Sequence, residues 1–425
     1  MPAAHFPLVT GLPFVVLLLV IALAPLAMPR WWEHHHHKAI VVALISAPIV
    51  LYLGFRAPDL LIEKIEEYVA FIVVIGALFV IAGGIHIQGS LAGTPLVNTG
   101  LLGIGAVLAN LLGTTGASVL LIRPLLRANK RRKRVAHIVV FCIFIVANCA
   151  GLLTPIGDPP LLLGYLKGVP FQWTLHLWPQ WLVVNGILLL LFNFMDEWAL
   201  DKDEKELPGS QHEAVLVHEP LRIRGAVEVL VLLGVIVSII VSAPLLVIIG
   251  LALVGYFAGS ADRRAKNAFT FGPIIEVAVL FAAIFATMAP VLEMLNAWAQ
   301  RPDFALRQPA HFFWAAGALS SVLDNAPTYL AYAASAAGLY DIAPHGQYIG
   351  ALALHPAGAK ILAAISTGAV FMGATTYIGN APNFMVKAIA EENGVKMPSF
   401  VAYLAYSVGI LLPLFVVVSL VFFKY

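Results

Sequence analysis

The sequence TPIGDPP at residues 154–160 returns, with changes, as TYIGNAP at residues 376–382. Each copy lies within a long apolar stretch, and each contains a Gly and a Pro, the two residues that interrupt helical geometry most strongly. Pro also disfavours helix at the residue before it, so carbonyl groups near each copy lose their helical partners. The pattern predicts a helix that is broken at corresponding points in the two halves of the chain.

The composition around these breaks is typical of a membrane protein. Of the 425 residues, 60% are hydrophobic and 11% are charged, whereas about 25% are charged in ordinary soluble proteins. So few charged side chains cannot cover a soluble domain, which excludes a cytosolic enzyme, a nucleic-acid binder and a disordered chain. The formal net charge of +2 indicates no polyanionic partner. We expect an all-α polytopic membrane protein.

Apolar runs of about 20 residues, the length that crosses a bilayer, recur along the chain. Two further stretches, 96–122 and 310–338, are rich in small residues and are interrupted by GTTGAS and LDNAPT. Such a polar break is typical of a re-entrant hairpin, because non-helical backbone at membrane depth must be packed in protein or line a cavity. The predicted spans are 8–28, 39–55, 68–87, 138–166 and 178–196 in the first half and 226–242, 244–259, 271–290, 359–392 and 400–423 in the second.

The order of these elements is the same in both halves, with three spans followed by a hairpin, a broken span and a last span. An odd number of spans per half inserts the second copy upside-down, which is the inverted-repeat pattern of secondary transporters. The predicted organisation is a first repeat at 1–196 (hairpin 96–122, broken helix 138–166), a cytoplasmic linker at 197–225, and a second repeat at 226–425 (hairpin 310–338, broken helix 359–392).

The distribution of Lys and Arg predicts the orientation. Eighteen of these 25 residues fall in loops that the topology puts on one side, and the other seven fall on the opposite side. Because cytoplasmic loops carry an excess of Lys and Arg, the first side is predicted to be cytoplasmic and both termini periplasmic. The first ten residues contain no Lys or Arg, so the first apolar run is expected to be a retained span and not a signal peptide.

Two acidic residues, Asp158 and Asp324, fall at chain breaks. A carboxylate within the membrane is costly, so each is a candidate for ion or proton binding, with a helix cap as the alternative. Asn380 can bind an ion, cap a half-helix, or do both. Na⁺ prefers an oxygen cage, and a carboxylate in that cage can exchange Na⁺ for H⁺. The sequence predicts two sites, one formed by Thr114, Thr115, Ser118 and Asp158 and the other by Asp324, Asn325, Thr328, Thr376 and Asn380, with Thr154 as a further candidate.

Polar residues elsewhere have simpler interpretations. Glu276, near the start of a span, is either an interfacial side chain or a proton relay. Glu228 lies at a membrane edge near Arg222 and Arg224 and is expected to be solvated or paired. The run His34–His37 lacks metal-ligand spacing and is interpreted as a polar interfacial loop, so no transition-metal site is predicted.

The motifs TPIGDPPLLLGYLKGVPF (154–171) and LDNAPTYLAYAA (323–334) resemble those of the ion transporter superfamily. This superfamily includes NhaD-type sodium/proton antiporters, arsenite pumps and divalent-anion/sodium symporters. The chain looks most like its bacterial proteins labelled as sodium:proton antiporters or as citrate transporters. The motif resemblance covers about residues 95–175 and 310–395. It implies two inverted repeats with re-entrant hairpins, a homodimer, a transport region that moves as an elevator, and cation sites where hairpin tips meet broken helices.

The residues at the two hairpin tips indicate which class of substrate is transported. Carboxylate symporters of the superfamily carry Ser-Asn-Thr at both tips, whereas this chain has Thr114-Thr115-Gly116 and Asp324-Asn325-Ala326. The first tip also departs from the Asp-Asn of related antiporters. We therefore predict a Na⁺/H⁺ antiporter of the bacterial inner membrane that exports Na⁺, or Li⁺ in its place, and needs no cofactor. A cation-coupled symporter of citrate or a dicarboxylate is the first alternative, and an arsenite-type oxyanion exporter is the second. HExxH and GxSxG motifs are absent from the spans, so an enzyme is not expected.

Overall fold

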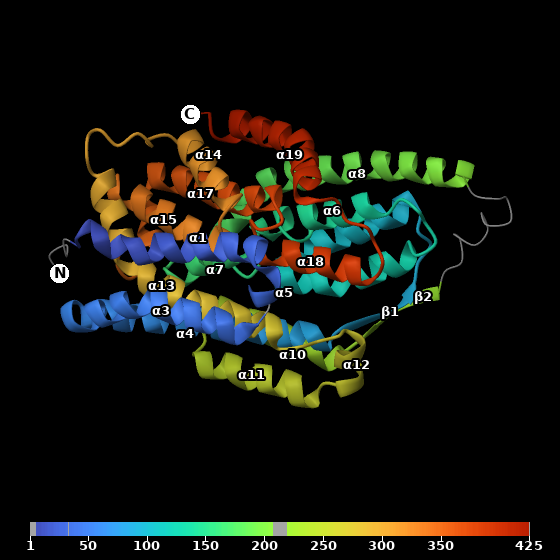
Figure 1. Ribbon diagram of the computed structural model, residues 1–425, viewed down its shortest axis with the longest axis horizontal. Coiled ribbons are helices and arrows are strands. Elements are labelled where there is room, and N and C mark those ends of the chain that lie inside the picture. The colour runs from blue at the N-terminus through green and yellow to red at the C-terminus, as the bar shows by residue number, and fades with distance from the viewer. Residues whose placement is uncertain (1–5, 33, 207–218, 425) are drawn as a thin grey trace.

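The computed structural model describes residues 6–32, 34–206 and 219–424, and this part of the chain folds into helices that run mostly along one axis (Figure 1). Eight of the described helices are long and apolar enough to cross a membrane. The predicted all-α polytopic fold is therefore confirmed. In the first half the elements are η1 (Leu8–Gly11), α1 (Leu12–Ala27), α2 (Pro29–Trp32), α3 (His35–Arg56), α4 (Pro58–Gly84), β1 (His86–Ser90), α5 (Pro95–Ala128), α6 (Ala136–Ile145), η2 (Cys149–Leu152), α7 (Pro159–Leu166), η3 (Phe171–Leu177) and α8 (Trp178–Glu206).

The second half begins after a short strand and contains the second hairpin and the second broken helix. Its elements are β2 (Glu219–Arg224), α10 (Ala226–Ile240), α11 (Leu245–Ala258), α12 (Ala261–Lys266), α13 (Gly272–Ala299), α14 (Pro309–Ser320), α15 (Asn325–Gly338), α16 (Tyr348–Leu354), α17 (Pro356–Met372), η5 (Gly373–Thr375), α18 (Ala381–Glu392) and α19 (Phe400–Phe422).

Helix α5 is a hairpin of two helical arms that meet at Gly113. The backbone there has φ 75° and ψ 156°, a conformation that glycine adopts without strain. The arms lie side by side, because a Cβ atom added at Gly105 would come within 2.7 Å of Leu121 Cδ1. Asn98 and Asn129, near the outer ends, exchange hydrogen bonds of 2.9 and 2.8 Å. A straight helix would hold these two residues roughly 45 Å apart.

The second hairpin consists of α14 and α15, which are joined by residues 321–324 and pack against each other and against α17. Asp324 is the N-cap of α15, and its Oδ1 accepts a hydrogen bond of 3.0 Å from the backbone N–H of Ala326. The ranges predicted for the hairpins, 96–122 and 310–338, fall within α5 and within α14–α15.

Each broken helix changes direction where the matched motifs stand. Between α6 and α7 the chain leaves helical geometry and passes through η2 to Asp158, which has φ −144° and ψ 146°. Between α17 and α18 it passes through η5 to Asn380, which has nearly the same conformation, φ −152° and ψ 141°. Both residues are N-caps by position, but the side chain of neither makes a capping hydrogen bond. Their side chains are therefore available for other partners.

The helices form two layers, which are distinguishable in Figure 1. We call α3, α4, α10, α11 and α13 the scaffold layer; in it α13 packs on α3 and α4, and α4 packs on α10 and α11. We call α5, α6, α7, α14, α15, α17 and α18 the hairpin layer. The two layers meet where α4 packs on α5 and α7 and where α13 packs on α15. Helix α6 is buried over almost its whole length, as expected for a helix that is apolar on all sides.

A two-stranded antiparallel ladder, not predicted from the sequence, joins the two halves at one end. Strand β1 follows α4, and β2 comes from the linker; Ile87 pairs with Ile223. Helix α8 continues to Glu206, ten residues beyond the predicted end of the last span of the first half. The predicted linker at 197–225 thus begins as helix and ends as strand, while residues 207–218 lie outside the described part.

Candidate functional site

The two threonines that begin the matched motifs each hold a broken helix against a hairpin. Thr154 Oγ1 donates to the backbone carbonyl of Asn110, in the first arm of α5, at 2.6 Å. Thr376 Oγ1 donates to the carbonyl of Ser321, at the second hairpin tip, also at 2.6 Å. Both threonines therefore satisfy carbonyl groups that helix ends leave without a helical partner. The equivalent sequence positions have equivalent contacts.

The first tip also meets the first break through backbone and side chain. The N–H of Thr114 donates to the carbonyl of Gly157 at 2.8 Å. The hydroxyl of Thr114 donates to Asp158 Oδ1 at 2.8 Å. The unusual backbone at Gly113 makes this possible, because it ends the first arm and turns the next N–H and hydroxyl toward the break.

Asp158 is the point where both hairpins and both breaks converge. It is 1% exposed. Besides the hydroxyl of Thr114, Asp158 Oδ1 accepts from Asn380 Nδ2 at 3.3 Å, and Asp158 Oδ2 accepts from Asn325 Nδ2 at 2.5 Å. Thr114 comes from the first tip, Asn325 from the second tip and Asn380 from the second break. All of these donors are neutral, so the carboxylate is hydrogen-bonded without an ion-pair partner among them.

This arrangement differs from the two separate sites predicted from the sequence. Asn325 and Asn380 were assigned to a second-half site, but their amides donate to the carboxylate of the first half. Residues of both halves form a single hydrogen-bond network around Asp158, where the sequence had suggested a separate site in each half. The physical reason is that the two hairpin tips and the two breaks meet in one interior, so residues of either half reach the same carboxylate.

Asp324 has a different environment from Asp158. Its side chain accepts from the N–H of Ala326, which is the capping role considered as the alternative at this position. Thr328 Oγ1 donates to the backbone carbonyl of Asp324 at 3.0 Å, so this hydroxyl also serves the local helix. Both residues lie close to Asn325 in sequence, yet neither has a hydrogen bond to Asp158 in the described part of the chain.

Two buried oxygen atoms near this network have no hydrogen-bond partner among the described residues. They are Oδ1 of Asn325 and Oγ of Ser118, and both residues are 0% exposed. Ser118 lies one helical turn after Thr114 on the second arm of α5. Oxygen atoms of this kind are suitable ligands for a hard cation such as Na⁺.

A cavity of about 70 Å³ begins at this network and extends between the layers. On the hairpin layer Thr115 lines it together with Asp158. On the scaffold layer the lining comes from the second half of α4 and from the first turns of α13. The scaffold residues in its wall are Ile75, Leu78, Phe79, Pro273, Ile274 and Val277.

Two asparagines that the sequence analysis missed connect the two breaks. Asn148 Nδ2 donates to Asn383 Oδ1 at 2.6 Å, and Asn380 Nδ2 donates to Asn148 Oδ1 at 3.2 Å. Asn383 Nδ2 then donates to the carbonyl of Thr376 at 2.9 Å. A signal was present, because Asn148 interrupts an apolar run and polar residues within spans are rare.

Glu276 and Glu228 are both paired away from the site. Glu276 Oε1 lies 2.6 Å from Lys38 Nζ, its side chain is 38% exposed, and no described contact links it to Asp158. Glu228 is fully buried and pairs with Arg263. Of the two states expected for Glu228, solvated or paired, the structure shows the paired one, and the partner is Arg263 of α12.

The histidine run packs against aromatic residues. The ring of His37 stacks on Trp31 with centroids 4.5 Å apart, and His37 Nδ1 lies 2.8 Å from the carbonyl of Trp31. Among the described residues no group of three or more His, Cys, Asp or Glu side chains is arranged to hold a metal ion.

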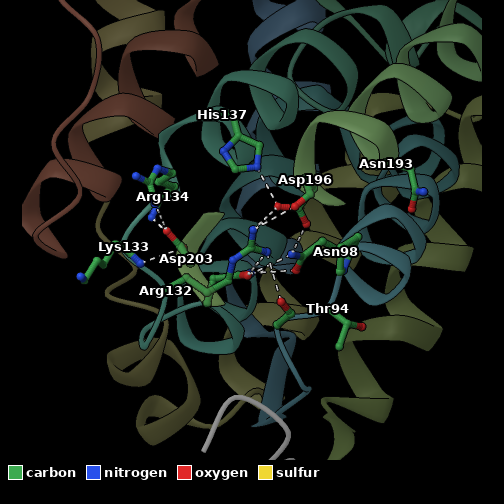
Figure 2. Close-up of polar contacts among 12 residues, drawn as sticks. Thr94, Asn98, Arg132, Lys133, Arg134, His137, Asn193, Asp196 and Asp203 are labelled. Atoms are coloured by element: carbon green, nitrogen blue, oxygen red, sulfur yellow. Dashed lines mark hydrogen bonds and ion pairs between the residues drawn. The ribbon is translucent and has the colours of Figure 1, made fainter. Parts of the chain in front are cut away.

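A buried polar network fixes the open end of the first hairpin (Figure 2). Asp196 of α8 pairs with Arg132 at 2.6 Å and lies 2.7 Å from His137 Nε2, and its Oδ2 accepts from Asn98 at 2.8 Å. Arg132 also donates to the carbonyl of Gly93 at 3.1 Å. Because these partners come from the start of α5, from the segments that flank α5 and from α8, the network holds the outer ends of the two arms together and joins them to α8.

The comparison with protein families gives one match. A family described as “Putative citrate transport” matches the chain over residues 3–247 and 243–423, which is almost its whole length. No curated protein matches the chain.

Proposed function

The chain belongs to the family described as “Putative citrate transport”, a family of membrane transporters, and on this premise we propose that it is a secondary active Na⁺/H⁺ antiporter. In this proposal it is of the NhaD type, exports Na⁺ or Li⁺ and admits protons by alternating access. It acts in the bacterial inner membrane, as a homodimer and without a cofactor. Both termini are then periplasmic.

The observation that carries the proposal is the environment of Asp158. A buried carboxylate is stable when it is protonated or when a cation balances its charge. Its hydrogen-bond donors, Thr114, Asn325 and Asn380, are neutral and leave the charge uncompensated. Either Na⁺ or H⁺ can supply the compensation, and the two cannot do so together. This competition for one carboxylate is the coupling that an exchanger requires.

Oxygen atoms around the carboxylate support Na⁺ as the cation. The unpartnered Oδ1 of Asn325 and Oγ of Ser118 add neutral ligands to the carboxylate oxygens, as hard cations prefer. The hydroxyl of Thr114 already contacts the carboxylate and can turn to present its own oxygen.

Transport of citrate with a coupling cation is the second candidate, and the family description favours it. The half-helices α7 and α18 start at the site, and their N-termini favour anions. A multiply charged anion would, however, approach Asp158 and Asp324 without a Lys or Arg in hydrogen-bond contact with either carboxylate among the described residues. We therefore rank citrate symport second and arsenite-type oxyanion export third.

Flux in proteoliposomes separates these candidates. Purified protein is reconstituted with a pH-sensitive dye inside, and Na⁺, Li⁺, K⁺ or labelled citrate is added outside. The antiporter proposal predicts dye responses to Na⁺ or Li⁺, no response to K⁺, and no citrate uptake. Citrate uptake that depends on Na⁺ or H⁺, without cation-induced proton movement, would contradict the antiporter proposal and support a cation-coupled citrate symporter.

A matched pair of variants links the flux to the site. Asp158→Asn removes the charge but keeps the shape, and it should reduce the Na⁺-induced dye response to that of protein-free vesicles. Asp201→Asn makes the same change on the exposed end of α8, where Asp201 pairs with Lys205, and should leave the response unchanged. Full activity of Asp158→Asn would contradict the proposed role of this carboxylate.

A further inference from the structure

A buried ion-pair cluster joins the two layers far from Asp158. Glu67 Oε1, on α4 of the scaffold layer, lies 2.9 Å from Lys64 Nζ and 2.6 Å from Lys167 Nζ. Lys64 and Lys167 are 2% and 1% exposed. One carboxylate thus receives two buried ammonium groups, of which one belongs to its own helix and one comes from the segment after α7.

Lys167 is attached to the hairpin layer. Its carbonyl accepts from the N–H of Gly350 at 2.9 Å, and its ammonium group lies 5.1 Å from the ring centroid of Tyr348. Lys167 therefore moves with α7 and with the segment that leads from α15 to α16. Its bond to Glu67 is a contact between layers, which any sliding of the hairpin layer along α4 must break.

The same loop makes two further contacts with the scaffold. The N–H of Gly346 donates to Glu63 Oε1, on α4, at 3.1 Å. His345 Nε2 lies 2.9 Å from Glu293 Oε1, on α13. Both scaffold helices that face the hairpin layer are thus fastened to the same short loop.

Apart from the neighbouring His345–Glu293 pair, three other buried ion pairs in the described part of the chain stay within one layer or at its edge. Lys38 and Glu276 connect α3 with α13, and Glu228 and Arg263 connect α10 with α12. The network of Asp196 connects α8 with the base of the first hairpin. The cluster around Glu67 differs because it joins parts that alternating access must separate.

The cavity at Asp158 lies at the opposite end of the same helices. Its wall on α4 reaches Phe79, twelve residues or about 18 Å from Glu67 along the axis. Its wall on α13 lies at Ile274 and Val277, in the first two turns, whereas Glu293 is near the end of that helix. A cavity thus separates the layers beside the start of α13, whereas polar contacts fasten them near its end.

We propose that Lys64, Glu67 and Lys167 form a gate, which closes one end of the interlayer pathway while the other end is open. Breaking the Lys167–Glu67 bond is then a required step of each transport cycle. This inference rests on the proposed alternating-access function, and with the predicted orientation the gate is on the periplasmic side. A contact made in only one of two states favours that state by its own free energy, so loss of the bond shifts the population toward the state open at this end.

Thiol labelling reports which end is open without any transport. Thr115→Cys places a thiol in the wall of the cavity, and the native Cys142 and Cys149 are fully buried. In cells or oriented vesicles a membrane-impermeant methanethiosulfonate reagent should label Thr115→Cys faster from the cytoplasmic side than from the periplasmic side. Adding Lys167→Gln should raise labelling from the periplasmic side about tenfold, the change expected if the gate contributes about 1.4 kcal/mol.

Three further variants make the result decisive. Glu67→Gln should have the same effect as Lys167→Gln, because either change removes the bond between layers. Lys167→Arg keeps the positive charge, so periplasmic labelling of Thr115→Cys should stay as low as with the native Lys167. Lys205→Gln, at an exposed pair on α8, should leave the labelling of Thr115→Cys unchanged from both sides. Unchanged periplasmic labelling in folded Lys167→Gln and Glu67→Gln proteins would overturn the gate. If periplasmic labelling rises in these variants but the protein shows no Na⁺/H⁺ exchange, the gate is supported and only the proposed substrates are wrong.

Discussion

Asp158 and Asp324 are the two acidic residues at chain breaks, one in each half, and both their positions and their surroundings differ. Asp158 stands at a break, does not cap its own helix, and accepts side-chain donors from three other segments. Asp324 stands at a hairpin tip and caps the helix that follows it. The backbone architecture is repeated, but the charge chemistry is concentrated in the first half. A repeat therefore conserves the shape of the site without giving both copies the same task.

The largest expected effect tests this difference directly. Asp158→Asn should abolish Na⁺-induced proton movement, whereas Asp324→Asn should retain a substantial part of it, because Asn is as good an N-cap as Asp. Asp324→Ala should then be worse than Asp324→Asn, since loss of a cap costs about 1 kcal/mol of stability. The measurements are dye flux and thermal unfolding of each purified variant. If Asp324→Asn is as inactive as Asp158→Asn while folded, the two carboxylates share the task and the comparison fails.

A smaller effect is expected at the junction between the halves. Asn325→Ala removes both a donor to Asp158 and an unpartnered oxygen. A hydrogen bond to a charged group contributes about 1.5 kcal/mol, so the concentration of Na⁺ for half-maximal flux should rise about tenfold. The control is Asn393→Ala, an exposed residue at the end of α18. An unchanged Na⁺ dependence of Asn325→Ala would remove the second tip from the site.

The sequence predicted the elements well because its strongest signals are local. Span length, small residues at the hairpins and Gly-Pro breaks each depend on neighbouring residues, and the two ranges predicted for hairpins fall within α5 and within α14–α15. The joint site was not predicted, because a repeat tells which positions correspond but not that Asn325 and Asn380 of one half reach Asp158 of the other. Lys64 and Lys167 were counted only as markers of topology. Their burial depends on Glu67, which lies 100 residues from Lys167 in sequence.

The labelling of Thr115→Cys is expected to change a few-fold with pH, because a histidine takes part in the contacts between the layers. The hydrogen bond from His345 to Glu293, together with the charges of Glu293 and Glu63, raises the pKa of this histidine above its usual value, against the opposing effects of burial and of the charge of Lys64. Because the pKa of His345 is raised when it contacts Glu293, protonation of His345 stabilises the fastened state. This stabilisation is complete below the ordinary histidine pKa of about 6.5 and is lost as the pH rises through the raised pKa. The ratio of periplasmic to cytoplasmic labelling of Thr115→Cys, in which the pH dependence of thiol reactivity cancels, should therefore increase with pH across this window.

Substitution of the histidine tests the assignment. His345→Gln should give a ratio of periplasmic to cytoplasmic labelling that no longer varies with pH in this window, while His176→Gln, at an exposed histidine in η3, should keep the normal profile of this ratio. A pH profile that survives in His345→Gln would assign the titration to another group.

The smallest effects are expected from the two matched threonines, and they test how far the repeat is symmetric in energy. Thr154 Oγ1 makes one hydrogen bond, to Asn110. Thr376 Oγ1 donates to Ser321 and also accepts from the N–H groups of Ile378 and Gly379 at 3.3 and 3.1 Å. Since a neutral hydrogen bond contributes about 1 kcal/mol, Thr154→Val should cost about 1 kcal/mol and Thr376→Val two to three times as much. The two variants are compared by their thermal unfolding midpoints in detergent. Equal decreases in the midpoint would show that the additional hydrogen bonds of Thr376 do not stabilise the second break.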